Sequence, residues 1–215
     1  LIGFCTYIWN IELVDELCKF VKRTKKSVTV LGGPEVSYNI EEHLKKEYVD
    51  YIISGEGEIP FSKLCKGEEI AKIEGLSYKQ NGQIVIKEPF VSSEMRNLPY
   101  TSKYFESLNG RIAYIETSRG CPNRCSYCLS GRCGSVKFFD LEESKKNILL
   151  LANSGTKTVK FVDRTFNASK KHAMNIWQYI KDNDNGITTF HCELSADLIN
   201  DEEIDSLCRY WVARY

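Results

Sequence analysis

Strand-like and helix-like segments alternate along both halves of the chain, and this alternation constrains the fold more than any other feature. In the first half, apolar strand-like runs begin at Leu1 and cover 28–31 and 51–54. Helical patterns at 11–23 and from about Asn39 separate these runs, and a short one from Pro60 follows the third. A β-α-β-α-β-α order predicts a parallel sheet with helices on both faces. Ligands of such sheets bind beyond the carboxyl ends of the strands.

The second half repeats the alternation after a different kind of segment. Residues 75–89 alternate around Asn81–Gly82, which predicts a β-hairpin, and residues 90–110 show no period and predict a linker. Three strand–helix pairs then follow, with strands at 111–117, 158–162 and 187–194, and helices starting near Asp140, 168 and Asn200. Three such units are too few to close a barrel, so the sequence predicts an open or incomplete one.

Composition excludes several classes of protein. The 215 residues include 29 Lys+Arg and 29 Asp+Glu, and this balance argues against sequence-independent binding of nucleic acid. No apolar run is long enough to cross a bilayer, and no signal peptide is recognisable at the start, so we expect no membrane partner and a cytoplasmic location. The chain starts without Met and stops within a helical pattern, which suggests a piece of a longer protein.

Cysteine is the most informative residue type. The chain has nine cysteines, and four of them lie within thirteen residues, at 121, 125, 128 and 133. In a reducing compartment, clustered cysteines more often bind metal or react than form disulfides. The other five are scattered and are expected to be small core residues: Cys5, Cys18, Cys65, Cys192 and Cys208.

The spacing C-x3-C-x2-C of Cys121, Cys125 and Cys128 favours a metal centre held by one loop. Three thiolates on three irons of a 4Fe–4S cluster would leave the fourth iron open to a substrate. The loop follows a predicted strand, so it lies at the carboxyl-end mouth of the sheet, where α/β barrels carry their chemistry. The alternative is a structural zinc site with Cys133 as the fourth ligand.

The segment CPNRCSYC, with an aromatic residue directly before the third cysteine, resembles the signature of the radical S-adenosylmethionine (radical SAM) superfamily. The resemblance implies that Cys121, Cys125 and Cys128 bind a 4Fe–4S cluster whose open iron binds S-adenosylmethionine. It further implies reductive cleavage to a 5′-deoxyadenosyl radical, with Tyr127 beside the adenine.

Two acidic residues are similar to family positions at later strand ends. The second strand ends in FVDRTFN, where Asp163 is the nearest candidate for the family's contact to the methionine amino group. The third strand ends in CELSAD, and Glu193 resembles an acidic residue that related enzymes direct at the bound nucleoside. The bland alternative for both is a helix cap or an ion pair.

The first half resembles the second part of the cobalamin-binding domain that precedes many radical SAM domains. The resemblance lies in VLGGPEVSYN and DYIISGEGEIPF, and it implies that Gly32 and Gly33 border the nucleotide tail of cobalamin. These glycines would otherwise only end a strand. The D-x-H-x-x-G motif that supplies the lower cobalt ligand is absent, because His43, His172 and His191 have other neighbours.

The sequence thus predicts an α/β chain: a partial Rossmann-like, cobalamin-binding-type domain (1–74), a hairpin and linker (75–110), and a partial radical SAM (β/α) barrel (111–215). The predicted function is a radical SAM enzyme, with cobalamin-dependent methyl transfer as one reaction class. The expected partners are a small-molecule or peptide substrate, which the sequence does not identify, and an electron donor such as flavodoxin or ferredoxin.

Two other hypotheses remain open at this point. One is a non-catalytic electron-transfer or zinc-stabilised binding module. The other is that this stretch is inactive alone, because further strands would complete the S-adenosylmethionine pocket and their absence would leave exposed sheet edges.

Overall fold

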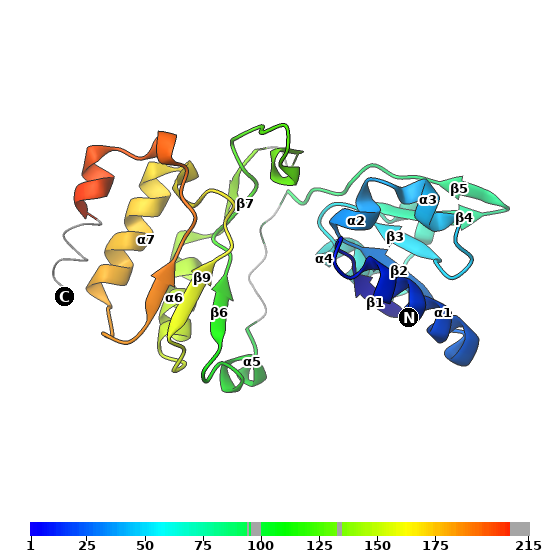
Figure 1. Ribbon diagram of the computed structural model, residues 1–215, viewed down its shortest axis with the longest axis horizontal. Coiled ribbons are helices and arrows are strands. Elements are labelled where there is room, and N and C mark those ends of the chain that lie inside the picture. Colours follow the sequence, from blue (N-terminus) through cyan, green and yellow to red (C-terminus); the bar gives the residue numbers. More distant parts are fainter. Residues whose placement is uncertain (94, 96–99, 133–134, 207–215) are drawn as a thin grey trace. The chain divides into compact units, whose positions relative to one another are not determined.

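The structure is a computed structural model that describes residues 1–93, 95, 100–132 and 135–206. The chain divides into two compact units, Leu1–Ser93 and Glu94–Tyr215. No helix among the described residues is both long and apolar enough to cross a membrane. Figure 1 labels the helices and strands of each unit.

The first unit is built on a five-stranded sheet in the order β1-β2-β3-β4-β5. Its strands are β1 (Ile2–Cys5), β2 (Thr29–Gly32), β3 (Tyr51–Ile53), β4 (Leu76–Gln80) and β5 (Gln83–Val85). The first three pair in parallel, as the alternation predicts, and the hairpin β4–β5 joins β3 antiparallel with Tyr51 opposite Tyr78.

Helices cover both faces of this sheet. They are α1 (Ile11–Lys25), α2 (Pro34–Ser37), α3 (Ile40–Leu44) and α4 (Glu58–Cys65), with a 3₁₀ turn η1 (Ile70–Lys72). Leu31 and Ile52 pack with α1, α2 and α3, whereas the neighbouring Val30 and Ile53 pack with Leu64 of α4. Successive strand residues point to opposite faces, so these two clusters form two core layers.

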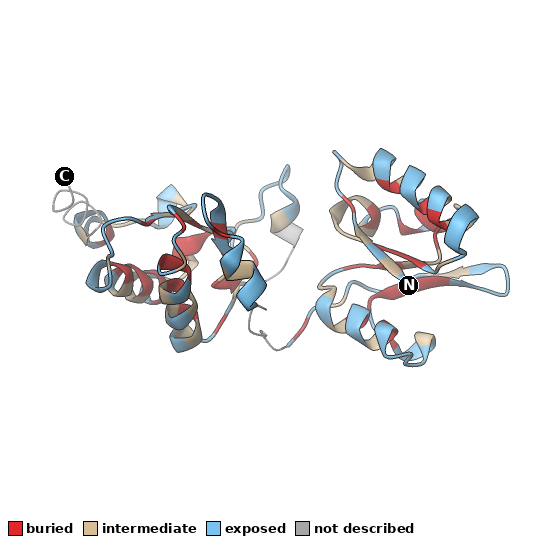
Figure 2. Ribbon diagram, turned by 90° about the horizontal axis from the view of Figure 1, so that it is seen from below, coloured by how far each residue is buried: buried red, intermediate tan, exposed pale blue. Residues whose placement is uncertain are grey.

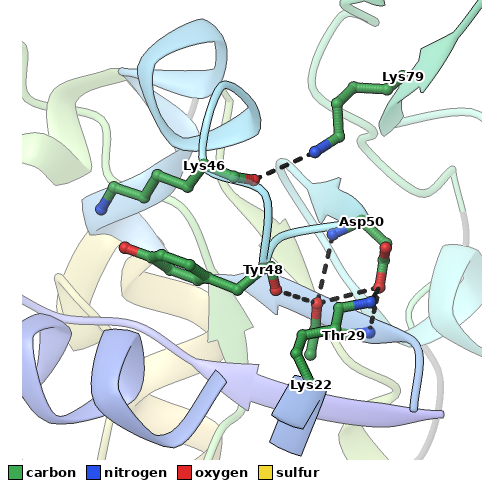
Figure 3. Close-up of polar contacts among 6 residues, drawn as sticks. All are labelled: Lys22, Thr29, Lys46, Tyr48, Asp50 and Lys79. Atoms are coloured by element: carbon green, nitrogen blue, oxygen red, sulfur yellow. Dashed lines mark hydrogen bonds and ion pairs between the residues drawn. The ribbon is translucent and has the colours of Figure 1, made fainter. Parts of the chain in front are cut away.

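A polar cluster fastens the amino ends of β2 and β3 (Figure 3). The Asp50 carboxylate accepts hydrogen bonds from the Thr29 amide at 2.7 Å and the Thr29 hydroxyl at 3.1 Å, and it pairs with Lys22. The single hydrogen of the Thr29 hydroxyl is shared between Asp50 and the Tyr48 carbonyl oxygen, which lies closer, at 2.6 Å. This cluster lies at the strand ends opposite the predicted ligand side, and its groups satisfy one another.

The second unit contains a three-stranded parallel sheet in the order β10-β9-β6 and a two-stranded pair, β7-β8. The strands are β6 (Ile112–Ile115), β7 (Ser118–Arg119), β8 (Lys137–Phe138), β9 (Thr158–Phe161) and β10 (Thr189–His191). The helices are α5 (Ser102–Glu106), α6 (Leu141–Ala152) and α7 (Lys170–Asp182), with 3₁₀ turns η2 (Leu129–Arg132), η3 (Phe166–Ala168) and η4 (Ala196–Leu198). Residues 201–206 are also helical.

Among the residues that the structure describes, only one face of the β10-β9-β6 sheet carries the core. Ala113, Ile115, Val159 and Phe161 are buried and pack in one cluster with residues of α6 and α7 (Figure 2). On the other face, Ile112 and Tyr114 are about half exposed. One covered face and one open face are what an incomplete barrel requires, so the predicted fold class is confirmed in both units.

Three expectations differ from the structure. The hairpin belongs to the first sheet, so the observed division falls after Ser93 and not after residue 74. The hairpin belongs to this sheet because β4 pairs with the edge of β3. The periodicity of a sequence does not reveal which strands pair. Cys5 and Cys65 are exposed and therefore are not core residues, although Cys18 is fully buried. Cys208 and Cys133 lie outside the described residues.

Candidate functional site

The cysteine loop, defined here as residues 120–136, leaves and re-enters the fold through the β7–β8 pair. Ser118 lies opposite Phe138 and Arg119 opposite Lys137, so the base of the loop is closed by main-chain pairing. Gly120 has a φ of 107°, and a Cβ there would lie 2.8 Å from the Ser135 carbonyl oxygen. Glycine is therefore required at the position directly before Cys121.

The predicted cluster ligands all lie on this loop, just beyond the carboxyl end of β6. Cys121 is half-buried, whereas Cys125 and Cys128 are exposed, and the Cys128 amide donates to the Cys125 carbonyl at 3.1 Å. Among the described residues, no three His, Cys, Asp or Glu side chains gather as they would around a single ion. A tetrahedral zinc site needs its ligands to meet at one point, whereas cluster thiolates bind separate irons. Thiolates are the ligands that iron–sulfur clusters take, so the donor set of this loop fits such a cluster.

Asp163 lies directly beneath the start of the loop and is almost fully buried, at 1% exposure. Its carboxylate accepts three hydrogen bonds, from the Thr117 amide at 2.8 Å, the Thr117 hydroxyl at 2.7 Å and the Ser118 hydroxyl at 2.6 Å. Burial raises the pKa of Asp163 above its ordinary value, although these hydrogen bonds act in the opposite direction. In this geometry, the side chain positions the β6–β7 connection.

A charged pocket of about 430 Å³ opens at the carboxyl ends of β6 and β9, beside Gly120. Arg119 makes a two-pronged ion pair with Glu116, with Nε–Oε1 at 2.9 Å and Nη2–Oε2 at 2.7 Å. Across the pocket, Lys160 Nζ lies 3.5 Å from Glu193 Oε1. The pocket therefore offers both signs of charge next to the cysteine loop, which suits a zwitterionic ligand.

The structure brings Glu193 into this pocket but leaves two other predicted residues outside it. Asp163 is absent from the pocket wall, and Tyr127 is 91% exposed on the loop. Sequence reasoning missed Arg119 and Lys160. The signal for Lys160 was its place between Val159 and Phe161, because the neighbours of buried strand residues face the other side of the sheet.

The first unit has its own pocket, of about 400 Å³, at the carboxyl ends of β1, β2 and β3. Gly32 and Gly33 line it together with Gly55 and Gly57, so the two glycine turns border one pocket. Gly33 has a φ of 112°, and a Cβ there would lie 2.4 Å from the Thr6 carbonyl oxygen. Backbone comes so close at this turn that no other residue fits.

The histidines give this pocket no candidate ligand among the described residues that line it. His43 is buried in α3, and its Nδ1 lies 3.3 Å from Lys46 Nζ. Burial, and secondarily Lys46, lowers the pKa of His43. His172 and His191 belong to the second unit.

The second unit resembles proteins of a known family. Residues 115–215, which contain the cysteine loop, strands β9 and β10 and most of the residues that line the charged pocket, match the radical SAM superfamily. These residues belong to that superfamily. The match begins at Ile115, so the radical SAM region starts where β6 ends and the cysteine loop follows.

Similar proteins extend the likeness into the first unit. An uncharacterized methyltransferase of Pyrococcus horikoshii is 29% identical over 181 residues, which cover 77% of this chain and 39% of that protein. The cobalamin-dependent radical SAM methyltransferase TokK of Streptomyces tokunonensis is 26% identical, covering 74% of this chain and 26% of that protein. The chain thus spans well under half the length of these relatives.

A solved structure shows the same fold. The radical S-adenosylmethionine methyltransferase TsrM from Kitasatospora setae, with cobalamin and a 4Fe–4S cluster bound, has a TM-score of 0.74 and 19% identity. The match covers 97% of this chain and 46% of that one, so it includes the Rossmann-like unit as well as the radical SAM unit. At this identity the likeness is one of fold.

Proposed function

We propose that this chain provides the cluster site and part of the S-adenosylmethionine pocket of a radical SAM enzyme, with cobalamin bound by the first unit. One observation carries the proposal: three cysteines share a strand-closed loop at the carboxyl end of β6, inside the region that matches the superfamily. When bound, the cluster supplies the electron for reductive cleavage of S-adenosylmethionine.

Each residue of the cysteine loop and its base has a proposed role. Cys121, Cys125 and Cys128 hold the cluster, and Gly120 lets the backbone turn into the loop without a steric clash. Asp163 holds the base of the loop through Thr117 and Ser118.

The charged pocket receives the amino-acid end and the nucleoside of S-adenosylmethionine. Arg119 and Lys160 offer positive charge to a carboxylate, and Glu116 and Glu193 offer negative charge to an ammonium group or hydroxyls. Tyr127 remains our candidate for the adenine contact.

Methyl transfer is the reaction class we favour. The similar proteins from Pyrococcus horikoshii and Streptomyces tokunonensis are named methyltransferases, and the second is named cobalamin-dependent. The glycine-lined pocket of the first unit supports cobalamin as the further cofactor, with Gly32 and Gly33 beside it. A low-potential electron donor such as flavodoxin or ferredoxin would reduce the cluster.

The first test is anaerobic reconstitution of the full chain with iron and sulfide. We expect a brown protein with charge-transfer absorption, and we expect Cys125→Ala to lose most of its iron because three thiolates are the minimum for this cluster. Cys133→Ala is the control and should keep its iron. A colourless protein that holds zinc and loses it on Cys133→Ala would establish the structural zinc module instead.

The second test separates the two reaction classes. Reduced protein mixed with S-adenosylmethionine should release 5′-deoxyadenosine if the radical is formed, and S-adenosylhomocysteine if a methyl group is transferred. Loss of both products in Cys125→Ala would tie them to the cluster. A cluster-loaded protein that forms neither would contradict the proposed chemistry.

A further inference from the structure

Thr165 lies in the connection that follows β9, directly before η3, and its side chain meets Cys121 at the start of the cysteine loop. Main-chain bonds hold it on both sides: the Ala168 amide donates to the Thr165 carbonyl at 3.0 Å, and the Phe166 amide donates to the Glu193 carbonyl at 2.9 Å. The residue is only 3% exposed. Its hydroxyl is therefore held in place and has little access to water.

The Thr165 hydroxyl oxygen lies 3.2 Å from Cys121 Sγ. Within the described part of the chain, this sulfur is the only hydrogen-bond partner of that hydroxyl. A buried hydroxyl without a partner is costly, so the contact is expected to persist. In a free thiol either atom could donate, but a metal-bound cysteine is a thiolate and can only accept. Cluster binding would therefore fix Thr165 as the donor.

We propose that Thr165 is a positioning residue whose hydroxyl donates a hydrogen bond to the cluster-ligating sulfur of Cys121 and raises the reduction potential of the cluster. The inference rests on the proposed function. A reduced cluster carries one more negative charge than an oxidised one, so a donor dipole aimed at its sulfur stabilises the reduced form more.

The hydrogen bond also distinguishes one ligand from another. Cys121 is half-buried and bonded to Thr165, whereas Cys125 is exposed to solvent. Hydrogen bonding and solvent exposure both tune clusters, so the fold controls the corner held by Cys121 through a buried group.

The test compares three variants of the full chain, each reconstituted without oxygen. Thr165→Val keeps the shape and removes the hydroxyl, and Thr165→Ser keeps the hydroxyl. Thr158→Val removes the threonine hydroxyl at the start of β9, whose hydrogen bond to Thr189 is exposed to solvent. Midpoint potentials are measured by redox titration followed by electron paramagnetic resonance. We expect a lower potential for Thr165→Val, and the parent value for Thr165→Ser and Thr158→Val.

Each other outcome also decides the question. If Thr165→Val is folded by circular dichroism but binds no iron while Thr165→Ser does, the hydroxyl is needed for assembly, and the hydrogen bond is supported. An unchanged or higher potential in Thr165→Val would overturn the inference, as would equal loss of iron in Thr165→Val and Thr165→Ser. A parent chain that assembles no cluster would overturn the proposed function as well, which separates the two failures.

Discussion

Asp163 is a buried carboxylate that accepts three hydrogen bonds at the base of the cysteine loop. The sequence identified it as the polar residue at the end of the second strand of the radical SAM unit, and the structure gives it the Thr117 amide and two hydroxyls. A sequence shows that a residue lies at the end of a strand, because the strand's periodic pattern stops there. Whether a carboxylate turns into a pocket or into the fold depends on side chains 45 residues away, such as Ser118, and no local pattern reports them.

Asp163→Asn should lower the free energy of unfolding by about 1–3 kcal/mol. The amide nitrogen would face a hydroxyl that now donates to a carboxylate oxygen, and a buried donor would lose its acceptor. Urea denaturation measures the change. Asp197→Asn is the control, because Asp197 accepts a serine hydroxyl bond on the exposed surface, and its loss should stay within about 0.5 kcal/mol. Equal effects would show that burial of Asp163 is irrelevant.

His172 predicts a pH dependence. Its ring is buried, its Nε2 lies 3.3 Å from the Thr117 hydroxyl, and burial lowers its pKa below the ordinary 6.5. The unfolded chain therefore takes up a proton at a pH where the folded chain does not, so stability falls as the pH drops through 6.5 toward the folded pKa.

We expect His172→Gln to flatten this dependence, measured as the free energy of unfolding between about pH 8 and pH 5. The flattening can reach about 1.4 kcal/mol per pH unit, the contribution of one proton. His191→Gln, at an exposed position, is the control and should leave the slope as it is. A parent-like slope in His172→Gln would contradict the assignment.

At the scale of elements, the sequence located the helices and strands better than it located their faces. The pattern that predicts the helix at 11–23 consists of Leu13, Leu17, Phe20 and Val21. Of these, only Val21 is buried in α1, on the same face as Val14 and Cys18. A helix with apolar residues on more than one side does not specify which side meets the sheet. That choice is made by partners such as Leu31 and Ile52.

The cysteine loop supplies a prediction for an element, because its entry depends on one glycine. Gly120→Ala should reduce iron binding and lower stability by about 1–3 kcal/mol, since the added methyl group meets the Ser135 carbonyl at a positive φ. Gly155→Ala is matched to it: Gly155 also has a positive φ, of 83°, but a Cβ there meets nothing within 4 Å. It should cost about 1 kcal/mol from the backbone alone and keep its iron. Iron content and thermal unfolding report both effects.

For the whole molecule, the strand–helix alternation predicted two α/β units but not where one stops. The two sheets also differ in a way that alternation conceals, because helices cover both faces of the first and one face of the second. The patterns of the strands hold part of this information. β2 is buried at three successive positions, whereas β6 alternates between exposed and buried. Buried runs indicate two covered faces, and alternation indicates one.

The two units should lose their cofactors independently. Gly33→Ala, which places a methyl group 2.4 Å from the Thr6 carbonyl oxygen, should reduce cobalamin retention and leave iron content unchanged. Cys125→Ala should do the reverse. Gly67→Ala is the control in the first unit, since Gly67 has a positive φ and open space around it. Cobalamin and iron are measured on the same samples by absorbance and elemental analysis, and parallel loss of both cofactors in either variant would contradict this separation.

The glycine turn after β3 is hydrogen-bonded to the last segment of the first unit. The Phe90 amide donates to the Ser54 carbonyl at 2.9 Å, and the Glu56 amide donates to the Phe90 carbonyl at 2.8 Å. The main chain of Phe90 is therefore bonded to the residues before and after Gly55. Gly55 also lines the pocket of the first unit. A ligand that displaces the Gly55 turn would therefore also displace the segment around Phe90, which is the last part of the first unit before Ser93.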